Sequence, residues 1–212
     1  RRLFDHVMNV FTQAAETAGY GRIETPILEE ESLFVRSVGE GTDVVDKELY
    51  SFEDRGGKRL ALRPEGTAGV VRSYLEQGMG SWPQPVKLYY LEEMFRYDRP
   101  QEGRYRQHKQ MGAEVIGDAH PSTDAQLIVL LGRVLKRLRL SGVSLQLNTI
   151  GDNACRPAYR KLLIEYLKSQ EQHLAPVDRD RVAKNPLRVL DSKEPKTKAV
   201  LDEAPQTLNH LC

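Results

Sequence analysis

The stretch of sequence that most constrains the fold is residues 95–117, FRYDRPQEGRYRQHKQMGAEVIG. It predicts two strands, at residues 87–97 and 104–116, joined by a polar loop that is rich in arginine. Such a loop adds little to a hydrophobic core. Arginine, however, presents a planar fork of donors that suits phosphate oxygens and keeps its charge near neutral pH. The segment therefore suggests a nucleotide site.

The loop and its flanks carry more basic than acidic side chains. One interpretation is a solvated hairpin tip, and the other is a clamp on a triphosphate or a nucleic-acid backbone. Arginines that flank buried strands favour the clamp. The basic residues are Arg96, Arg99, Arg104, Arg106 and Lys109, and the acidic ones are Asp98 and Glu102.

Side chains along a strand alternate between two faces. In the segment 104–116 one face is apolar and the other is polar, and buried polar groups need partners. The polar face is either a ligand surface or the solvent side of a half-exposed sheet, and periodicity alone does not separate the two. Gly112 leaves a gap at which a small molecule could lie close to the backbone. The apolar face comprises Met111, Ala113 and Val115, and the polar face comprises Arg104, Arg106, His108, Gln110, Gly112 and Glu114.

Hydrophobic spacing and turn residues predict the other elements. Strands clustered before residue 150, with helices around them, indicate an α+β fold in which an antiparallel sheet is flanked by helices. After Asn153 the sequence becomes helical and rich in surface charge, so we expect a change of domain near residues 151–155. The predicted helices are 3–18, 67–78 and 123–140, the last opened by a capping box at Thr123, and the predicted strands are 48–52, 59–62 and 145–150, with 21–28 extended around Pro26.

The turn Arg63-Pro64-Glu65-Gly66-Thr67 lies between a predicted strand and a predicted helix. Its plain interpretation is a helix start with Thr67 as the N-cap. A functional interpretation is that Glu65, fixed by a short rigid turn, receives an ammonium group. The segment Val38–Asp43 lacks the rest of a dinucleotide fingerprint and predicts only a tight loop.

Composition excludes several classes of protein. The 31 basic and 30 acidic residues argue against a histone-like nucleic-acid binder, and the two distant cysteines, Cys155 and Cys212, argue against a disulfide framework and fit a reducing cytosol. We find no membrane span and no signal peptide in the sequence. The five histidines show no metal-ligand spacing, so no protein-only metal site is expected. Without a nucleophile motif, we expect chemistry driven by positioning and charge.

Taken together, these segments resemble the bacterial histidyl-tRNA synthetases, a family of class II aminoacyl-tRNA synthetases. The resemblance covers essentially the whole chain. Residues 34–52 are similar to the N-terminal signature of the family, 62–67 to its amino-acid-binding turn, 21–28 to motif 1, 95–117 to motif 2, and 185–191 to the start of its insertion domain.

The resemblance implies a domain order. Residues 1–152 would form a class II catalytic core with motifs 1 and 2, and residues 153–212 would begin the insertion domain. Motif 3 and the anticodon-binding domain of the family are not found in the sequence. We therefore expect the N-terminal part of a longer protein, inactive or strongly impaired in adenylate formation by itself.

The resemblance also implies roles for the polar residues of motif 2. Arg96 would be catalytic and would hold the α-phosphate of ATP and the substrate carboxylate. Asp98 stands where the family usually has Glu contacting adenine, and Arg104 would reach the far phosphates. Mg²⁺ would accompany ATP.

The histidine pocket and the dimer interface are implied in the same way. Glu65, Thr67 and Gln110 would bind the α-amino group of histidine, and Glu114 would accept a hydrogen bond from its imidazole ring. Gly66 and Arg96 would also belong to the histidine site. Alternation along the strand separately places Gln110 and Glu114 on one face. Motif 1 forms the dimer interface of class II enzymes, so Pro26 would lie in the interface of a homodimer.

The implied activity is ATP-dependent activation of L-histidine to histidyl-adenylate and transfer to the 3′ end of tRNA(His) in the cytoplasm. The alternative is a non-catalytic, histidine-sensing regulatory subunit of ATP phosphoribosyltransferase, which shares the fold and the pocket. That protein generally lacks an intact arginine-rich motif 2 loop. The residues that argue for the enzyme are Arg96, Arg99, Gln101, Gly103, Arg104 and Arg106.

Overall fold

The structure is a computed structural model and describes residues 2–39, 42, 44–99, 101–149 and 151–211. These residues form two compact units, Arg1–Gly142 and Val143–Cys212, each with a hydrophobic core of its own. The division falls before the predicted change near residues 151–155. The assignment of residues 1–152 to a catalytic core and 153–212 to an insertion domain stays a prediction.

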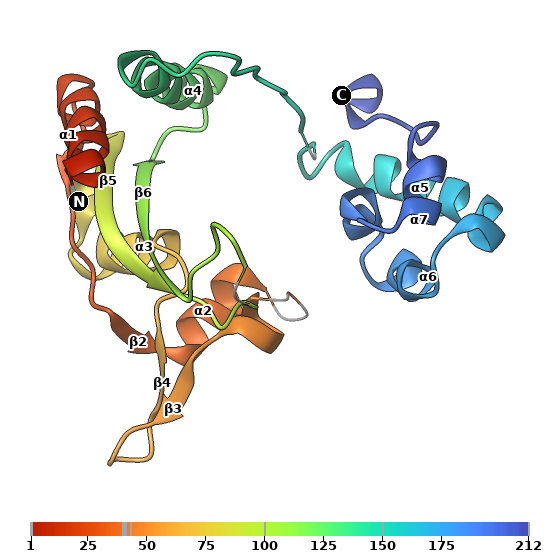
Figure 1. Cartoon of the computed structure of the whole chain (residues 1–212), viewed down its shortest axis with the longest axis horizontal. Coiled ribbons are helices and arrows are strands. Elements are labelled where there is room, and N and C mark those ends of the chain that lie inside the picture. Colours follow the sequence, from red (N-terminus) through yellow and green to blue (C-terminus); the bar gives the residue numbers. More distant parts are fainter. Residues whose placement is uncertain (1, 40–41, 43, 100, 150, 212) are drawn as a thin grey trace. The chain divides into compact units, whose positions relative to one another are not determined.

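Two long strands organise the first unit. Strand β5 (Val86–Phe95) pairs antiparallel with β6 (Gln107–Ile116) along the full length of both, and β1 (Gly21–Arg22) adds to the other edge of β5 (Figure 1). The predicted α+β fold with antiparallel strands and flanking helices is confirmed, although the short β1–β5 pairing is parallel and makes this sheet mixed. A parallel pair needs a long connection, and the chain between β1 and β5 supplies it.

A second small sheet carries the predicted hairpin. Its order is β2 (Leu28–Glu30), β4 (Arg59–Leu62) and β3 (Ser51–Glu53), all antiparallel. Asp54 holds the turn, because its Oδ1 accepts hydrogen bonds from the backbone of Gly56 and Lys58 at 2.8 and 2.9 Å. The hairpin prediction is therefore confirmed.

Helices cover both faces of the β5–β6 pair. Helix α1 (Arg2–Thr17) and helix α4 (Pro121–Arg137) pack on the face that bears Tyr89. Helix α3 (Thr67–Glu76) packs Val70 against the opposite face. The predicted apolar and polar faces of β6 are thus both present, and each face of the pair has a buried hydrophobic cluster.

Short elements complete the first unit. Helix α2 (Glu31–Val38) buries Phe34 beside β4 and α3. A π-helical turn, Val44–Glu48, and a 3-10 turn, Met79–Ser81, follow. The tight loop predicted for 38–43 includes positions 40, 41 and 43, which lie outside the described residues.

The predicted start of helix α4 is wrong. Helix α4 begins at Pro121 and not at Thr123, and the ring of His120 accepts a hydrogen bond from the backbone of Ser122 at 3.2 Å. Thr123 donates its hydroxyl to Asp118 instead. Pro is favoured in the first turn of a helix because its missing N–H has no intrahelical partner there.

The predicted strand 145–150 is also wrong over the residues that can be compared. Residues 145–149 form no strand, and position 150 lies outside the described residues. Leu145 and Leu147 are 68% and 66% exposed. A strand needs a neighbour for its backbone groups, and the described part of this unit contains no other strand.

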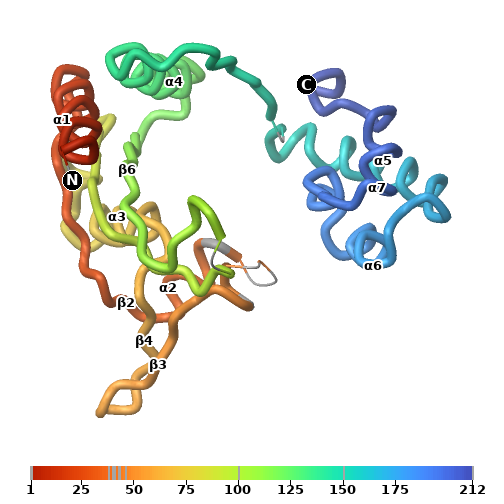
Figure 2. Tube along the Cα trace, viewed as in Figure 1, coloured from red at the N-terminus to blue at the C-terminus, as the bar shows by residue number. Residues whose placement is uncertain are grey.

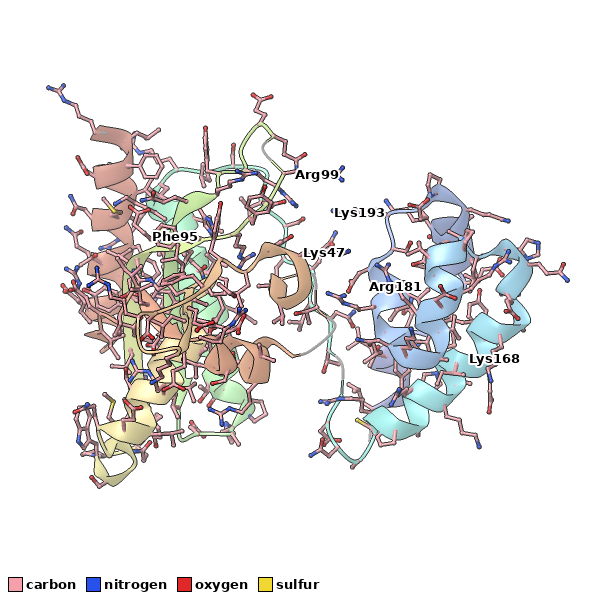
Figure 3. All side chains as sticks on the ribbon, turned by 90° about the horizontal axis from the view of Figure 1, so that it is seen from below. Lys47, Phe95, Arg99, Lys168, Arg181 and Lys193 are labelled. Atoms are coloured by element: carbon pink, nitrogen blue, oxygen red, sulfur yellow. The ribbon has the colours of Figure 1, made fainter. Side chains whose placement is uncertain are left out.

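The second unit is helical, as the charge-rich sequence predicted (Figure 2). Its buried core centres on Tyr159, Leu163 and Leu167. Asp178 is fully buried and is held by Ser192, Thr197 and Arg181, the last of which is labelled in Figure 3. The elements are α5 (Arg156–Ser169), α6 (Pro176–Lys184), α7 (Pro195–Leu201) and 3-10 turns at Glu171–His173, Pro186–Asp191 and Thr207–His210. Among the described residues, no helix has the length and apolarity that crossing a membrane requires.

Candidate active site

The polar face of β6 lies opposite a defined set of residues on β5. Gln110 pairs with Glu92, Gly112 with Tyr90, and Glu114 with Leu88. Because β6 begins at Gln107, the predicted face loses Arg104 and Arg106, which lie in the preceding loop. His108, Gln110, Gly112 and Glu114 keep their predicted alternation.

Tyr90 fills the gap that was predicted beside Gly112. A Cβ atom added to Gly112 would lie 2.1 Å from Cζ of Tyr90, and one added to Gly66 would lie 2.4 Å from the same atom. The aromatic ring therefore fits between two glycines, and the prediction that a small molecule lies against Gly112 is wrong. The sequence did not reveal this because the residue opposite Gly112 depends on strand register.

The hydroxyl of Tyr90 links two of the predicted histidine-binding residues. It accepts a hydrogen bond from Nε2 of Gln110 at 3.3 Å and donates a long one to Oε1 of Glu114 at 3.5 Å. Thr67 donates its hydroxyl to the same oxygen of Glu114 at 2.8 Å. Within the described part of the chain, Oε2 of Glu114 receives no hydrogen bond, so this oxygen is available to an N–H group of a ligand.

Burial and charge set the ionisation of this cluster. Burial raises the pKa of Glu114, the hydrogen bond from Thr67 opposes that shift, and the charge of nearby Glu65 adds to it. Burial, followed by the charge of Glu114, raises the pKa of Tyr90 to about 12. The phenol therefore stays protonated as a donor. Two carboxylates near one another suit a ligand that brings positive charge or N–H donors.

Glu65 caps helix α3. Its carboxylate accepts the backbone N–H groups of Thr67 at 2.6 Å and Ala68 at 2.9 Å. The prediction of Thr67 as the N-cap is therefore wrong, because Gly66 precedes the helix and the Glu65 side chain satisfies its first donors. The positive end of a helix dipole favours a carboxylate there. A carboxylate has about four acceptor positions, so Glu65 keeps capacity for an ammonium group.

Arg96 follows directly after β5. Its Nε donates to the carbonyl oxygen of Pro64 at 2.8 Å, and its backbone N–H donates to the carbonyl of Arg106 at 2.8 Å. No described carboxylate forms an ion pair with it. The Nε bond thus fixes the guanidinium beside the Pro64 turn and leaves its Nη groups for an anionic ligand.

Asp98 and Arg104 meet each other rather than an open space. Their side chains form an ion pair with Nη1 and Oδ2 at 3.0 Å. The guanidinium of Arg106 stacks on the ring of Tyr97, 4.0 Å from its centroid. Arg99, labelled in Figure 3, lies on the same loop with its side chain directed away from the sheet. The loop therefore gathers the predicted cations, but the Asp98–Arg104 ion pair would have to open before either side chain could take its predicted role.

A groove of about 540 Å³ opens between α2 and α3. Glu65 and Thr67 line it, together with apolar side chains such as Val71 and Leu75, whereas Gln110 and Glu114 do not. The groove thus contains only part of the predicted histidine site. The groups that could bind a polar ligand lie in the hydrogen-bonded cluster of Thr67, Tyr90, Gln110 and Glu114, and this cluster is the candidate site.

Pro26 lies in the segment between β1 and β2 and is exposed. The next two residues, Ile27 and Leu28, are 47% and 45% exposed. This exposure is compatible with an interface, which stays a prediction. The described residues contain no group of three or more His, Cys, Asp or Glu side chains arranged to hold a metal ion.

Sequence reasoning missed three residues near the site. Tyr90 is one, and the buried ion pair between Arg63 and Glu92, with Nη1 and Oε2 at 3.0 Å, supplies the other two. A signal for Glu92 was available, since it interrupts an otherwise apolar alternation on β5. Buried charges are almost always paired.

The comparisons first give the class of protein: the chain has the fold of the aminoacyl-tRNA synthetases. Pyrrolysyl-tRNA synthetase from Desulfitobacterium hafniense aligns with a TM-score of 0.56 over 66% of this chain and 49% of its own. At 13% identity this match shows the fold alone.

Sequence then identifies the particular family. The family model described as Histidyl-tRNA synthetase matches residues 2–186, so the chain belongs to that family. The histidine–tRNA ligase of Dehalococcoides mccartyi is 52% identical over 203 residues, covering 94% of this chain and 49% of that protein. The ligase of Thermosynechococcus vestitus is 46% identical over 211 residues, covering 100% and 49%. The chain spans about half the length of these curated relatives.

Solved structures agree with the family. Apo histidyl-tRNA synthetase from S. aureus matches with a TM-score of 0.73 and 31% identity, covering 99% of this chain and 46% of that one. A Bacillus halodurans protein titled as an ATP phosphoribosyltransferase regulatory subunit/histidyl-tRNA synthetase matches with a TM-score of 0.61 over 98% of this chain and 62% of its own. Its 22% identity shows the fold alone and does not favour the regulatory alternative.

Proposed function

We propose that the complete protein carrying this chain is a class II histidine–tRNA ligase. It would activate L-histidine with ATP to give histidyl-adenylate and pyrophosphate, and would then transfer the histidyl group to the 3′ end of tRNA(His). The observation that carries this proposal is the cluster of Thr67, Tyr90, Gln110 and Glu114, with the Arg96 guanidinium hydrogen-bonded to the adjoining turn at Pro64. The family match supports it.

The cluster provides a complementary set of groups for histidine. Glu65, Thr67 and Gln110 offer acceptors to the α-ammonium group, since the Thr67 hydroxyl already donates its proton to Glu114. Oε2 of Glu114 would accept an imidazole N–H. A ligand lacking that N–H leaves a half-buried carboxylate unpaired, which penalises analogues strongly. The pocket therefore selects by hydrogen bonding rather than by size alone.

Arg96 would act at the reacting atoms. A carboxylate oxygen of histidine attacks the α-phosphorus of ATP, a new O–P bond forms, and the bond to pyrophosphate breaks. The Nη groups of Arg96 would hold the carboxylate and stabilise negative charge on the α-phosphate, while the Pro64 carbonyl keeps the guanidinium in place. Positioning and charge stabilisation are what phosphoryl-group chemistry chiefly requires.

The loop residues would bind the rest of the nucleotide. Arg104 would leave Asp98 to contact the far phosphates, and Asp98 would then be available to adenine. Mg²⁺ bound to ATP supplies further positive charge to the phosphates. The unpaired Nη groups of Arg96 and the arginines of the loop fit a triphosphate.

We propose two further properties on structural grounds. The exposed segment at Pro26, Ile27 and Leu28 would contribute to a homodimer interface. The first unit would belong to the catalytic core and the helical second unit to an insertion domain, acting in the cytoplasm. The separate core of the helical unit supports its assignment as a domain of its own.

The regulatory alternative explains fewer of these features. A histidine sensor would use Glu65, Gln110 and Glu114 in the same way. It would have no use for an arginine whose Nη groups are open beside the pocket, or for the arginine-rich loop. These features favour the ligase.

The test is Arg96→Ala in the complete protein. We expect histidine-dependent ATP–pyrophosphate exchange to fall by about 100-fold or more, since removing one donor at a developing charge commonly costs that much. Arg133→Ala, an exposed arginine of α4 on the other face of the β5–β6 pair, is the matched control and should keep near-normal exchange. Near-normal exchange by Arg96→Ala would contradict the proposal. Histidine binding without any exchange by the wild-type protein would favour the regulator.

A further inference from the structure

Arg63 and Glu92 form a buried ion pair behind the site. Both are almost inaccessible, at 6% and 7% exposure, and Nη1 of Arg63 lies 3.0 Å from Oε2 of Glu92. Removing two charges from water is costly unless hydrogen bonds satisfy their remaining groups. Arg63 meets that condition by donating Nη1 to the carbonyl of Thr25 at 2.6 Å and Nε to the carbonyl of Glu93 at 2.8 Å.

Thr25 completes the network. Its backbone N–H donates to Oε1 of Glu92 at 2.6 Å, and its hydroxyl donates to Oε2 at 3.0 Å. A Cβ atom added to Gly69 of α3 would lie 3.1 Å from the Thr25 hydroxyl oxygen, so the segment also packs closely on that helix. The network thus joins three stretches of chain that are far apart in sequence.

The backbone extends this network to the site. Arg63 donates its N–H to the carbonyl of Ile27 and accepts the N–H of Phe95, both at 3.0 Å. The next carbonyl, that of Pro64, receives Nε of Arg96. An unbroken set of hydrogen bonds therefore runs from the segment beside Pro26 to the turn that presents Glu65 and to Arg96.

We propose that Arg63 and Glu92 are positioning residues for the reaction. They fix the turn 63–67 against the end of β5, so that Glu65 and Arg96 face one substrate in a single geometry. They also tie that geometry to the exposed segment at Pro26. This inference rests on the proposed function, because its kinetic consequence assumes that Glu65 and Arg96 bind histidine and ATP.

The choice of a charged pair supports positioning over simple packing. Apolar side chains of similar volume would fill the same space at lower desolvation cost. They would not fix the plane of a guanidinium that serves two carbonyls and a carboxylate at once. Directional bonds of this kind define orientation, and misplacement of reacting groups by about 1 Å can cost about 100-fold in rate.

The main experiment is Glu92→Gln in the complete protein, with active sites titrated. We expect the KM for histidine to rise and kcat/KM in ATP–pyrophosphate exchange to fall by up to about 100-fold. A purely structural role would lower the number of active sites and leave the KM of each site unchanged, which would overturn the proposal. Glu93→Gln is the matched control, since Glu93 is the next residue, lies on the other face of β5 and pairs with the partly exposed Lys109 at 3.1 Å.

Two further measurements keep the proposal falsifiable if Glu92→Gln folds poorly or shows no ATP–pyrophosphate exchange. Thr25→Val removes only one hydroxyl of the network and should shift the histidine KM in the same direction by a smaller factor. Hydrogen exchange does not depend on the reaction. In Thr25→Val we expect faster exchange at the amides of Thr67, Ala68 and Phe95, with α1 unchanged, and unchanged rates at all of them would overturn the positioning role. Absence of histidine-dependent ATP–pyrophosphate exchange in the wild type would contradict the proposed function and leave the positioning role to the hydrogen-exchange result.

Discussion

The two faces of the β5–β6 pair each bury a tyrosine, but the hydroxyl groups of the two tyrosines have different partners. On one face Tyr89 packs with Phe11 of α1 and its hydroxyl bonds Glu16 at 2.9 Å. On the other face Tyr90 directs its hydroxyl to Gln110 and Glu114. Both tyrosines are 1% exposed. Burial therefore does not distinguish a core residue from a site residue, whereas the partners of the polar atom do.

The same contrast holds along β6. Ala113 and Val115 contact the core that α1 and α4 cover, while Gln110 and Glu114 alternate with them on the site face. Both faces pack against helices, but only the face that bears Tyr90 also holds the polar groups of the candidate site. Substitutions at packing positions should accordingly act on stability, and substitutions of the polar site groups should act on ligand binding.

Tyr89→Ala should have the largest effect and should act on stability. Removing a buried aromatic ring that packs edge-to-face on Phe11, with centroids 6.0 Å apart, should lower the free energy of unfolding by about 3–5 kcal/mol. Urea unfolding of the first unit would measure this change. The histidine affinity of the remaining folded protein should not change, and a large change in affinity would break the separation of the two faces.

Glu114→Gln should act mainly on histidine. Loss of a charged acceptor should cost about 1.5–3 kcal/mol, which weakens histidine binding about 10- to 100-fold. ATP binding should change little, because the arginines that would contact ATP lie after β5. Calorimetric titration of the complete protein with each ligand would measure both. Equal losses for histidine and ATP would mean that Glu114 has a structural role.

Tyr90→Phe should have a smaller effect on the same face. The ring stays between Gly66 and Gly112, so stability should be preserved, while histidine binding should weaken by about 0.5–1.5 kcal/mol. The matched control is Tyr89→Phe, which removes the bond to Glu16 on the other face. If both variants weakened histidine binding equally, the hydroxyl of Tyr90 would have no special role.

The pH dependence of stability should show the smallest effect. Since the pKa of Glu114 is raised in the folded state, the folded chain binds this proton more tightly than the unfolded chain. Its contribution to stability is present below the ordinary pKa of Glu and is lost as pH rises through the raised value. Denaturant titrations at several pH values would give the free energy of unfolding of wild type and Glu114→Gln as a function of pH. The two curves should differ in slope within that pH window and run parallel outside it. Parallel curves at every pH would contradict the shift.

Sequence reasoning succeeded where local pattern decides the outcome. Alternation in β6 correctly placed Gln110 and Glu114 on one face and Ala113 and Val115 on the other. Turn residues correctly placed the β3–β4 hairpin. These features depend on neighbours in sequence, which a single chain displays directly.

It failed where contacts join distant residues. The gap at Gly112 is filled because strand register brings Tyr90 opposite, and the helix after Gly66 is capped by Glu65 rather than Thr67. The Arg63–Glu92 pair joins residues whose proximity no local pattern encodes. The strand predicted at 145–149 lacks the partner that only tertiary structure could supply.

The ring of Tyr90 between Gly66 and Gly112 makes the three positions interdependent in evolution. A Cβ atom at either glycine would fall within 2.4 Å of the ring, so Gly66→Ala or Gly112→Ala should be harmful in the presence of Tyr90. With a small side chain at position 90, the same substitutions should become acceptable or even favourable. The fitness effect of each glycine substitution would thus change sign with genetic background. Lineages that keep the tyrosine have few single-step routes by which to reshape this end of the pocket.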